Sequence, residues 1–227
     1  MPAYIQNQPT GTKTVQPNFQ LKGGMGAVPD TVSAPEIGFV LDRSSSMHHL
    51  VNEAVNGFNT LVDEQRALTP PANFSFSLFN YDVKLVYDAV PIGQVASLTS
   101  ATYEPYGGTA LNDGIGSMIH SIGKRAKRST RVLIAILTDG AENSSRSFSE
   151  ADILQMITYR RTTYDWQFVF IGPEAGLSYA LSIGIPKSNV VAFDTDPAGM
   201  KLIMERLSKS MCAYQLGDRR YALKLRN

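Results

Sequence analysis

The chain has 227 residues, of which 43% are hydrophobic, and its formal net charge is +1. A chain of this length can bury a substantial core in one generous domain or two small ones. The near-neutral charge gives no reason to expect binding to nucleic acid or to an anionic membrane, and no apolar run approaches the ~18 residues of a membrane span.

The first 34 residues are rich in Gln, Asn, Thr, Pro and Gly and have almost no periodic apolar residues. Such a segment buries too little surface to offset the entropy lost on ordering, so we predict a flexible tail over residues 1–34. The segment also lacks the apolar centre of a secretory signal, and we therefore expect a cytoplasmic protein. A tail of this length is also long enough to dock on a neighbour and form a homo- or hetero-oligomer.

After Pro35, strand-like and helix-like segments alternate to about residue 213. Strands are predicted at 37–41, 74–79, 83–90, 131–137, 166–171 and 189–193. Helices are predicted over 47–68, after residue 109, after the capping box Ser149–Asp152, around 177–181 and after Asp196. This alternation indicates one α/β domain over 35–213, a Rossmann-like, doubly wound, mostly parallel sheet with helices on both faces. Residues 214–227 form a basic carboxyl-terminal tail.

One strand is expected to run against the others. The segments 74–79 and 83–90 are separated by Asn80, Tyr81 and Asp82 alone, which is typical of a β-hairpin. We therefore predict a sheet of about six strands with one antiparallel hairpin strand.

Asp42, Ser44 and Ser46 follow directly behind the first buried strand. Oxygen ligands at the carboxyl end of such a strand suit a hard cation such as Mg²⁺. An acidic residue among serines is also what a helix cap or an Asx-turn contains, so this stretch alone does not decide between a cap and a metal site.

Two distant residues belong to the same predicted sheet edge. Thr109 follows Gly107 and Gly108 at the start of a helix, and Asp139 follows the strand 131–137. In a doubly wound sheet these positions converge with Asp42. The set resembles the metal-ion-dependent adhesion site (MIDAS) of von Willebrand factor A (VWA) domains, which combines an Asp-x-Ser-x-Ser loop with a distant Thr and a distant Asp. The chain is most similar to the small stand-alone bacterial and phage members of that family.

The resemblance implies a metal site formed by Asp42, Ser44, Ser46, Thr109 and Asp139, holding Mg²⁺ with Mn²⁺ and Ca²⁺ as alternatives. It further implies a protein-binding module, in which an Asp or Glu of a partner protein completes the coordination. No nucleic-acid or membrane partner is expected.

Two other functions stay open. The polar tail is compatible with a structural subunit of a phage particle or a bacterial complex. A metal-dependent phosphoester hydrolase would need a base beside the ion, and Glu142 is the one weak candidate. The aspartyl-phosphatase pattern lacks its second Asp, which is replaced by Ser44, and no phosphate loop or nucleophile elbow is present. We therefore expect no enzyme activity.

Other polar residues are interpreted as structural or exposed. Glu142 and Asn143 follow the strand end closely enough to support the ligands from behind, but we favour solvated loop residues. We expect His48 and His49 to be surface residues at the rim of the site rather than ligands. Asp113 either orients a loop or favours its helix amino terminus. The basic run 124–128 is expected to be a solvated helix end.

Overall fold

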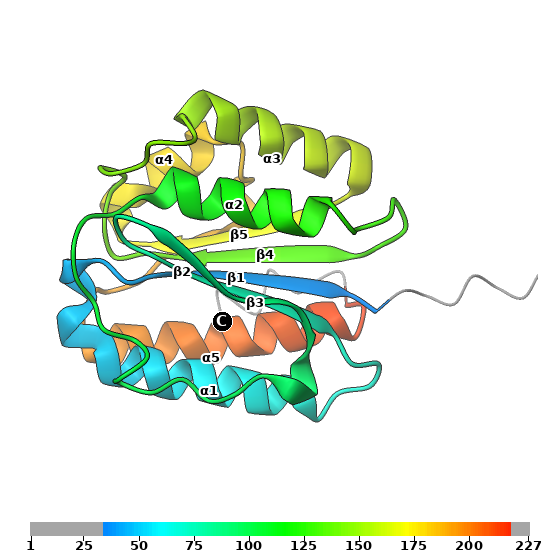
Figure 1. The fold of residues 1–227 in the computed structure, drawn as a ribbon, viewed down its shortest axis with the longest axis horizontal. Helices are drawn as coiled ribbons and strands as arrows, with labels where there is room; N and C mark the ends of the chain where they lie inside the picture. The colour runs from blue at the N-terminus through cyan, green and yellow to red at the C-terminus, as the bar shows by residue number, and fades with distance from the viewer. Residues whose placement is uncertain (1–33, 219–227) are drawn as a thin grey trace, which may run out of the picture. The chain divides into compact units, whose positions relative to one another are not determined.

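Residues 34–218 are described by the computed structural model, and they contain a six-stranded sheet between two layers of helices (Figure 1). The chain divides into two units, Met1–Thr31 and Val32–Asn227, and the described residues belong to the second. The predicted tail at 1–34 lies outside the described residues except for Ala34. The same holds for residues 219–227 of the predicted carboxyl-terminal tail.

The sheet has the strand order β3-β2-β1-β4-β5-β6. Its strands are β1 (Glu36–Asp42), β2 (Asn73–Phe79), β3 (Val83–Pro91), β4 (Val132–Leu137), β5 (Gln167–Gly172) and β6 (Val190–Ala192). The β2–β3 pair is antiparallel, and every other neighbouring pair is parallel. The predicted fold class is therefore confirmed, including the single antiparallel hairpin strand.

The two central strands are continuous apolar runs because helices cover both of their faces. Every residue of β1 and of β4 is buried. Helices α1 (Val51–Arg66) and α5 (Pro197–Gln215) lie on one face of the sheet. Helices α2 (Leu111–Gly123), α3 (Glu150–Tyr164) and α4 (Leu177–Ser182) lie on the other, as Figure 1 shows. This burial leaves the loops at the strand ends as the places where polar side chains gather.

Several element boundaries differ from the prediction, mostly by one or two residues. The first helix does not begin at residue 47, because Ser45–Leu50 forms a tight 3-10 turn before α1. At the start of that turn, the Ser44 and Ser46 hydroxyl oxygens are 3.0 Å apart. The last strand is three residues long instead of five. Helix α5 runs past residue 213 to Gln215, whose buried side-chain amide donates to the Pro70 carbonyl at 2.9 Å.

The helix starts follow the predicted capping. The Ser149 hydroxyl accepts from the Asp152 amide, and the Asp152 carboxylate accepts from the Ser149 amide, which completes a capping box. Asp196 caps α5 by accepting from the Gly199 amide at 2.7 Å. Within residues 34–218, no helix is both long enough and apolar enough to cross a membrane.

Candidate metal centre

Three loops meet at the carboxyl edge of the sheet. Asp42 is the last residue of β1, and β4 ends at Leu137, which pairs with Leu41 in the neighbouring strand. Asp139 follows two residues after that strand end, so the two carboxylates lie at the same edge. The third loop precedes α2 and is joined to the first by two backbone hydrogen bonds. The Ser45 amide donates to the Gly107 carbonyl at 3.1 Å, and the Tyr106 amide donates to the Arg43 carbonyl at 3.0 Å.

Four of the five predicted ligands form one connected chain of hydrogen bonds. The Asp42 Oδ1 atom accepts from the Ser44 amide at 2.6 Å. The Ser44 and Ser46 hydroxyl oxygens are 3.0 Å apart, and the Ser46 hydroxyl donates to Asp139 Oδ1 at 2.6 Å. Residues 93 positions apart in the sequence are thereby in direct contact.

Thr109, the fifth predicted ligand, reaches the same place. A Cβ atom added at Gly140 would lie 3.3 Å from Thr109 Oγ1 and 3.7 Å from Ser46 Oγ. Both hydroxyl oxygens therefore face one small space beside Gly140. A larger residue at position 140 would fill that space, which makes glycine the residue that keeps it open.

Burial makes this cluster electrostatically unusual. Asp42 is fully buried, and this burial raises its pKa to about 6, although hydrogen bonds from Thr138 and Ser44 act in the opposite direction. Burial also raises the pKa of Asp139, against the hydrogen bond from Ser46. Within residues 34–218, neither carboxylate forms a salt bridge. A cation at this edge would stabilise the ionised form of both groups.

The donor set fits a hard divalent cation. It consists of two carboxylates and three hydroxyls, which are the oxygen ligands that Mg²⁺ and Ca²⁺ prefer. The described part of the chain has no cluster of three or more His, Cys, Asp or Glu side chains that could hold a metal ion. Any metal bound here would therefore depend on the hydroxyl oxygens of the two serines and Thr109.

The loop after β4 holds the Thr109 loop in place, and the expectation that Glu142 and Asn143 are merely solvated is wrong. Asn143 Oδ1 accepts from the Thr109 amide at 2.8 Å, and the Asn143 amide donates to the Thr109 carbonyl at 3.0 Å. The Glu142 carboxylate accepts from the Asn112 amide at 2.8 Å and from the Ser145 amide at 2.8 Å. The bonds to Thr109 and Asn112 join residues 34 and 30 positions apart, so only the position of Glu142 and Asn143 behind the strand end indicated their role.

Asp113 orients a loop, which is the first of the two roles considered for it. Its carboxylate accepts from the backbone amides of Arg146, Ser147 and Phe148, each at 2.9 Å. Tyr103 was not predicted as part of the site, but it is fully buried and its hydroxyl donates to the Asp42 carbonyl at 2.6 Å. Tyr103 thereby fixes the backbone at the first candidate ligand.

Both histidines at the rim are exposed, as predicted. The Nδ1 atom of His49 is 2.8 Å from the Ser46 carbonyl, and its Nε2 atom is 2.9 Å from the Thr195 carbonyl. The Thr195 carbonyl in particular raises the pKa of His49. The ring thus bridges the first loop and the start of α5, and both nitrogens are engaged with backbone oxygens instead of facing a metal.

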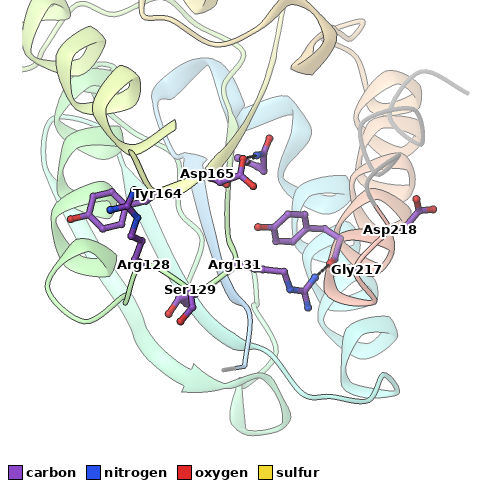
Figure 2. A pocket seen from close by; sticks show the side chains of 10 residues that line it. Arg128, Ser129, Arg131, Tyr164, Asp165, Gly217 and Asp218 are labelled. Atoms are coloured by element: carbon purple, nitrogen blue, oxygen red, sulfur yellow. Dashed lines mark hydrogen bonds between the residues drawn. The ribbon is translucent and has the colours of Figure 1, made fainter. Parts of the chain in front are cut away.

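The opposite edge of the sheet carries the basic residues. Arg125 is not a freely solvated helix end, because its guanidinium contacts Glu36 at 2.9 Å and Asp88 at 2.6 Å. A cavity of about 420 Å³ lies at this edge. Figure 2 shows the side chains that line it, among them Arg128, Arg131, Tyr164 and Asp165. Arg131 donates to the Tyr214 and Gln215 carbonyls at 2.7 and 3.0 Å, so it caps the end of α5. None of the five candidate ligands lines this cavity.

Solved structures with this arrangement of elements include several VWA domains. The von Willebrand factor type A protein from Catenulispora acidiphila matches over 80% of this chain and 43% of its own, with 18% identity and a TM-score of 0.57. The fold is that of a VWA domain. Proximal thread matrix protein 1 from the mussel byssus, solved with a zinc-occupied MIDAS motif, matches over 79% of this chain and 46% of its own, with 20% identity and a TM-score of 0.59.

A third structure with this fold is the pilus adhesin SpaC from Lactobacillus rhamnosus GG. It matches over 81% of this chain and 30% of its own, with 13% identity and a TM-score of 0.65. The chain therefore spans less than half the length of each of these three proteins. No family model matches the sequence, and no curated protein matches it. At these identities the likeness concerns the fold.

Proposed function

We propose that this VWA domain is a protein-binding module that depends on a divalent cation. Asp42, Ser44, Ser46, Thr109 and Asp139 would hold Mg²⁺, with Mn²⁺ and Ca²⁺ as alternatives. The observation that carries the proposal is the convergence of two poorly solvated carboxylates and three hydroxyls from three loops at one sheet edge. The zinc-occupied MIDAS of the mussel protein supports divalent-metal binding on this fold.

The five residues divide the work between charge and coordination. The two carboxylates balance the charge of a divalent cation, and the hydroxyls add neutral oxygens. Since Mg²⁺ takes six ligands, five side chains leave a position for a further oxygen. When bound, the cation supplies that position to an Asp or Glu of a partner protein. Asn143, Glu142 and Tyr103 keep the three loops at their mutual spacing through the backbone hydrogen bonds described above.

Hydrolysis is disfavoured by the state of its candidate base. The Glu142 carboxylate accepts hydrogen bonds from three backbone amides and from the Ser145 hydroxyl. A carboxylate committed in this way is a loop anchor, so we propose that the domain is not an enzyme. The assembly alternative rests on the amino-terminal segment, which lies outside the described residues.

The experiment is a comparison of captured proteins. The purified protein is immobilised and exposed to extract from its source cells in Mg²⁺ or in chelator, and bound proteins are identified by mass spectrometry. We expect a partner that is retained in Mg²⁺, lost in chelator and lost with Asp42→Ala. Ser45→Ala is the matched control, because Ser45 is exposed in the same loop and is not a candidate ligand. Retention that is equal in Mg²⁺ and in chelator, and equal for Asp42→Ala, would contradict the proposal.

A further inference from the structure

Arg43 occupies a distinctive place between two candidate ligands. It lies between Asp42 and Ser44 in the sequence, and its backbone carbonyl accepts from the Tyr106 amide at 3.0 Å. Its guanidinium stacks over the Tyr106 ring, with the central carbon 5.1 Å from the ring centroid. Tyr106 immediately precedes the Gly107–Gly108–Thr109 loop and has 51% of its surface exposed. The guanidinium of Arg43 therefore lies at the rim of the candidate metal centre.

The polar atoms of this side chain have no partner among residues 34–218. The Nε atom is buried and forms no hydrogen bond, and no salt bridge within that range includes Arg43. The guanidinium carries five N–H donors, and a buried donor without a partner destabilises the folded state. By contrast, Arg66 forms a salt bridge with Asp63, and Arg125 forms one with Glu36. The two terminal nitrogens of Arg43 are not buried and form no salt bridge within residues 34–218, so they are the donors that an anion from outside this domain can reach.

We propose that Arg43 binds a second carboxylate of the partner, so that the recognised segment is diacidic. One acid completes the coordination of the cation, and the other accepts a forked hydrogen bond from the Arg43 guanidinium. This inference rests on the proposed function, because the first acid requires the metal. Arginine suits the second acid, because its planar fork matches the two oxygens of a carboxylate.

The chemistry of an extended peptide fits this arrangement. Acidic residues two positions apart in an extended segment point to the same side, with Cα atoms about 7 Å apart. The stacking of Arg43 on Tyr106 fixes the direction of the fork before the partner arrives, which reduces the entropy lost on binding. The preferred partner segment is therefore Asp-x-Asp or Glu-x-Glu, and a single acid is a poorer ligand.

Two synthetic peptides test this directly. Acetyl-Asp-Gly-Asp-amide and acetyl-Asp-Gly-Asn-amide are nearly equal in shape and differ in one carboxylate. Affinities are measured by NMR titration of the protein in saturating Mg²⁺, with the Arg43 Nε–H resonance followed as a local probe. We expect the diacid to bind about tenfold more tightly. The Arg43 resonance should shift with the diacid and stay in place with the monoacid.

Two variants separate the role of Arg43 from that of the metal. Arg43→Gln should bind both peptides with the monoacid affinity of the wild type, while its Mg²⁺ affinity stays within about threefold. Lys84→Gln removes an equal charge from exposed strand β3 and should keep the full preference for the diacid. Both variants keep the five candidate ligands, and circular dichroism verifies that they are folded.

The outcomes distinguish this inference from the proposed function. If both peptides bind equally and only in Mg²⁺, the role of Arg43 is contradicted and the metal-dependent module stands. A preference for the diacid that survives in Arg43→Gln would also contradict it. If Mg²⁺ does not bind to the wild type, or neither peptide binds in its presence, the proposed function and this inference fail together.

Discussion

The two edges of the sheet bury carboxylates in opposite ways. At the amino edge, Glu36 is 5% exposed and is paired with Arg125, which also contacts Asp88. At the carboxyl edge, Asp42 is fully buried and lies near Asp139, and neither forms a salt bridge within residues 34–218. Within residues 34–218, the buried carboxylate at the amino edge has a salt-bridge partner, and the two carboxylates at the carboxyl edge have none. The amino edge thus contributes a paired charge to stability, whereas on the proposed function the unpaired carboxylates of the carboxyl edge would bind a cation from solution.

Removing the Arg125 guanidinium at the amino edge should destabilise the domain. Arg125→Ala leaves Glu36 buried without its partner, and we expect a loss of about 2–3 kcal/mol in the free energy of unfolding. The expected loss lies below that of a fully buried pair because the Arg125 side chain is 26% exposed. Urea unfolding measures it, and Lys124→Ala, at an exposed neighbouring position, should change stability by less than about 0.5 kcal/mol. Equal stability of the two variants would contradict the structural role of Arg125.

At the carboxyl edge, replacing a charged residue should stabilise the metal-free protein. The pKa of Asp42 is raised from 3.8 to about 6, so the folded state retains a proton that the unfolded chain has already lost between these values. Stability without metal therefore falls as the pH rises through this window, and Asp42→Asn removes the loss. We expect Asp42→Asn to gain about 1–2 kcal/mol relative to wild type between pH 5 and pH 8 in chelator.

Urea unfolding at the two pH values measures this gain, with Asp82→Asn as the control at an exposed carboxylate. Saturating Mg²⁺ at pH 8 should stabilise the wild type and leave Asp42→Asn unchanged. The interpretation fails if Asp42→Asn is destabilised equally at pH 5 and pH 8 in chelator.

How much the sequence predicts differs between the sheet and its loops. The strands were predictable because β1 and β4 are uninterrupted apolar runs, and the five candidate ligands were predictable because each follows such a run or a Gly-Gly turn. The positions of Asn143 and Tyr103 were not, because they hydrogen-bond to backbone groups 34 and 61 residues away. Backbone donors and acceptors leave no pattern in the side-chain sequence. The pairing of Glu36 with Arg125 was not predictable either, because the two residues are 89 positions apart in the sequence.

The supporting bond from Asn143 predicts a smaller effect on the same edge. Asn143→Ala frees the Thr109 amide and loosens the third loop, so Mg²⁺ affinity should fall about tenfold while the fold persists. Calorimetric titration with Mg²⁺ measures the change. Ser147→Ala is the control, because that exposed residue in the same loop contributes only its backbone amide to Asp113. Unchanged affinity in Asn143→Ala would show that the Thr109 loop needs no support from Asn143.

The most direct measurement is a calorimetric titration of Mg²⁺ and Mn²⁺ into chelator-treated wild-type protein, Asp42→Ala and Ser45→Ala, with circular dichroism to verify folding. We predict one site per wild-type chain, an equal affinity in Ser45→Ala and a loss of more than about 100-fold in Asp42→Ala, since one of two charged ligands is removed. Equal metal affinity in folded wild type and folded Asp42→Ala would contradict the assignment of the carboxyl edge as a metal centre.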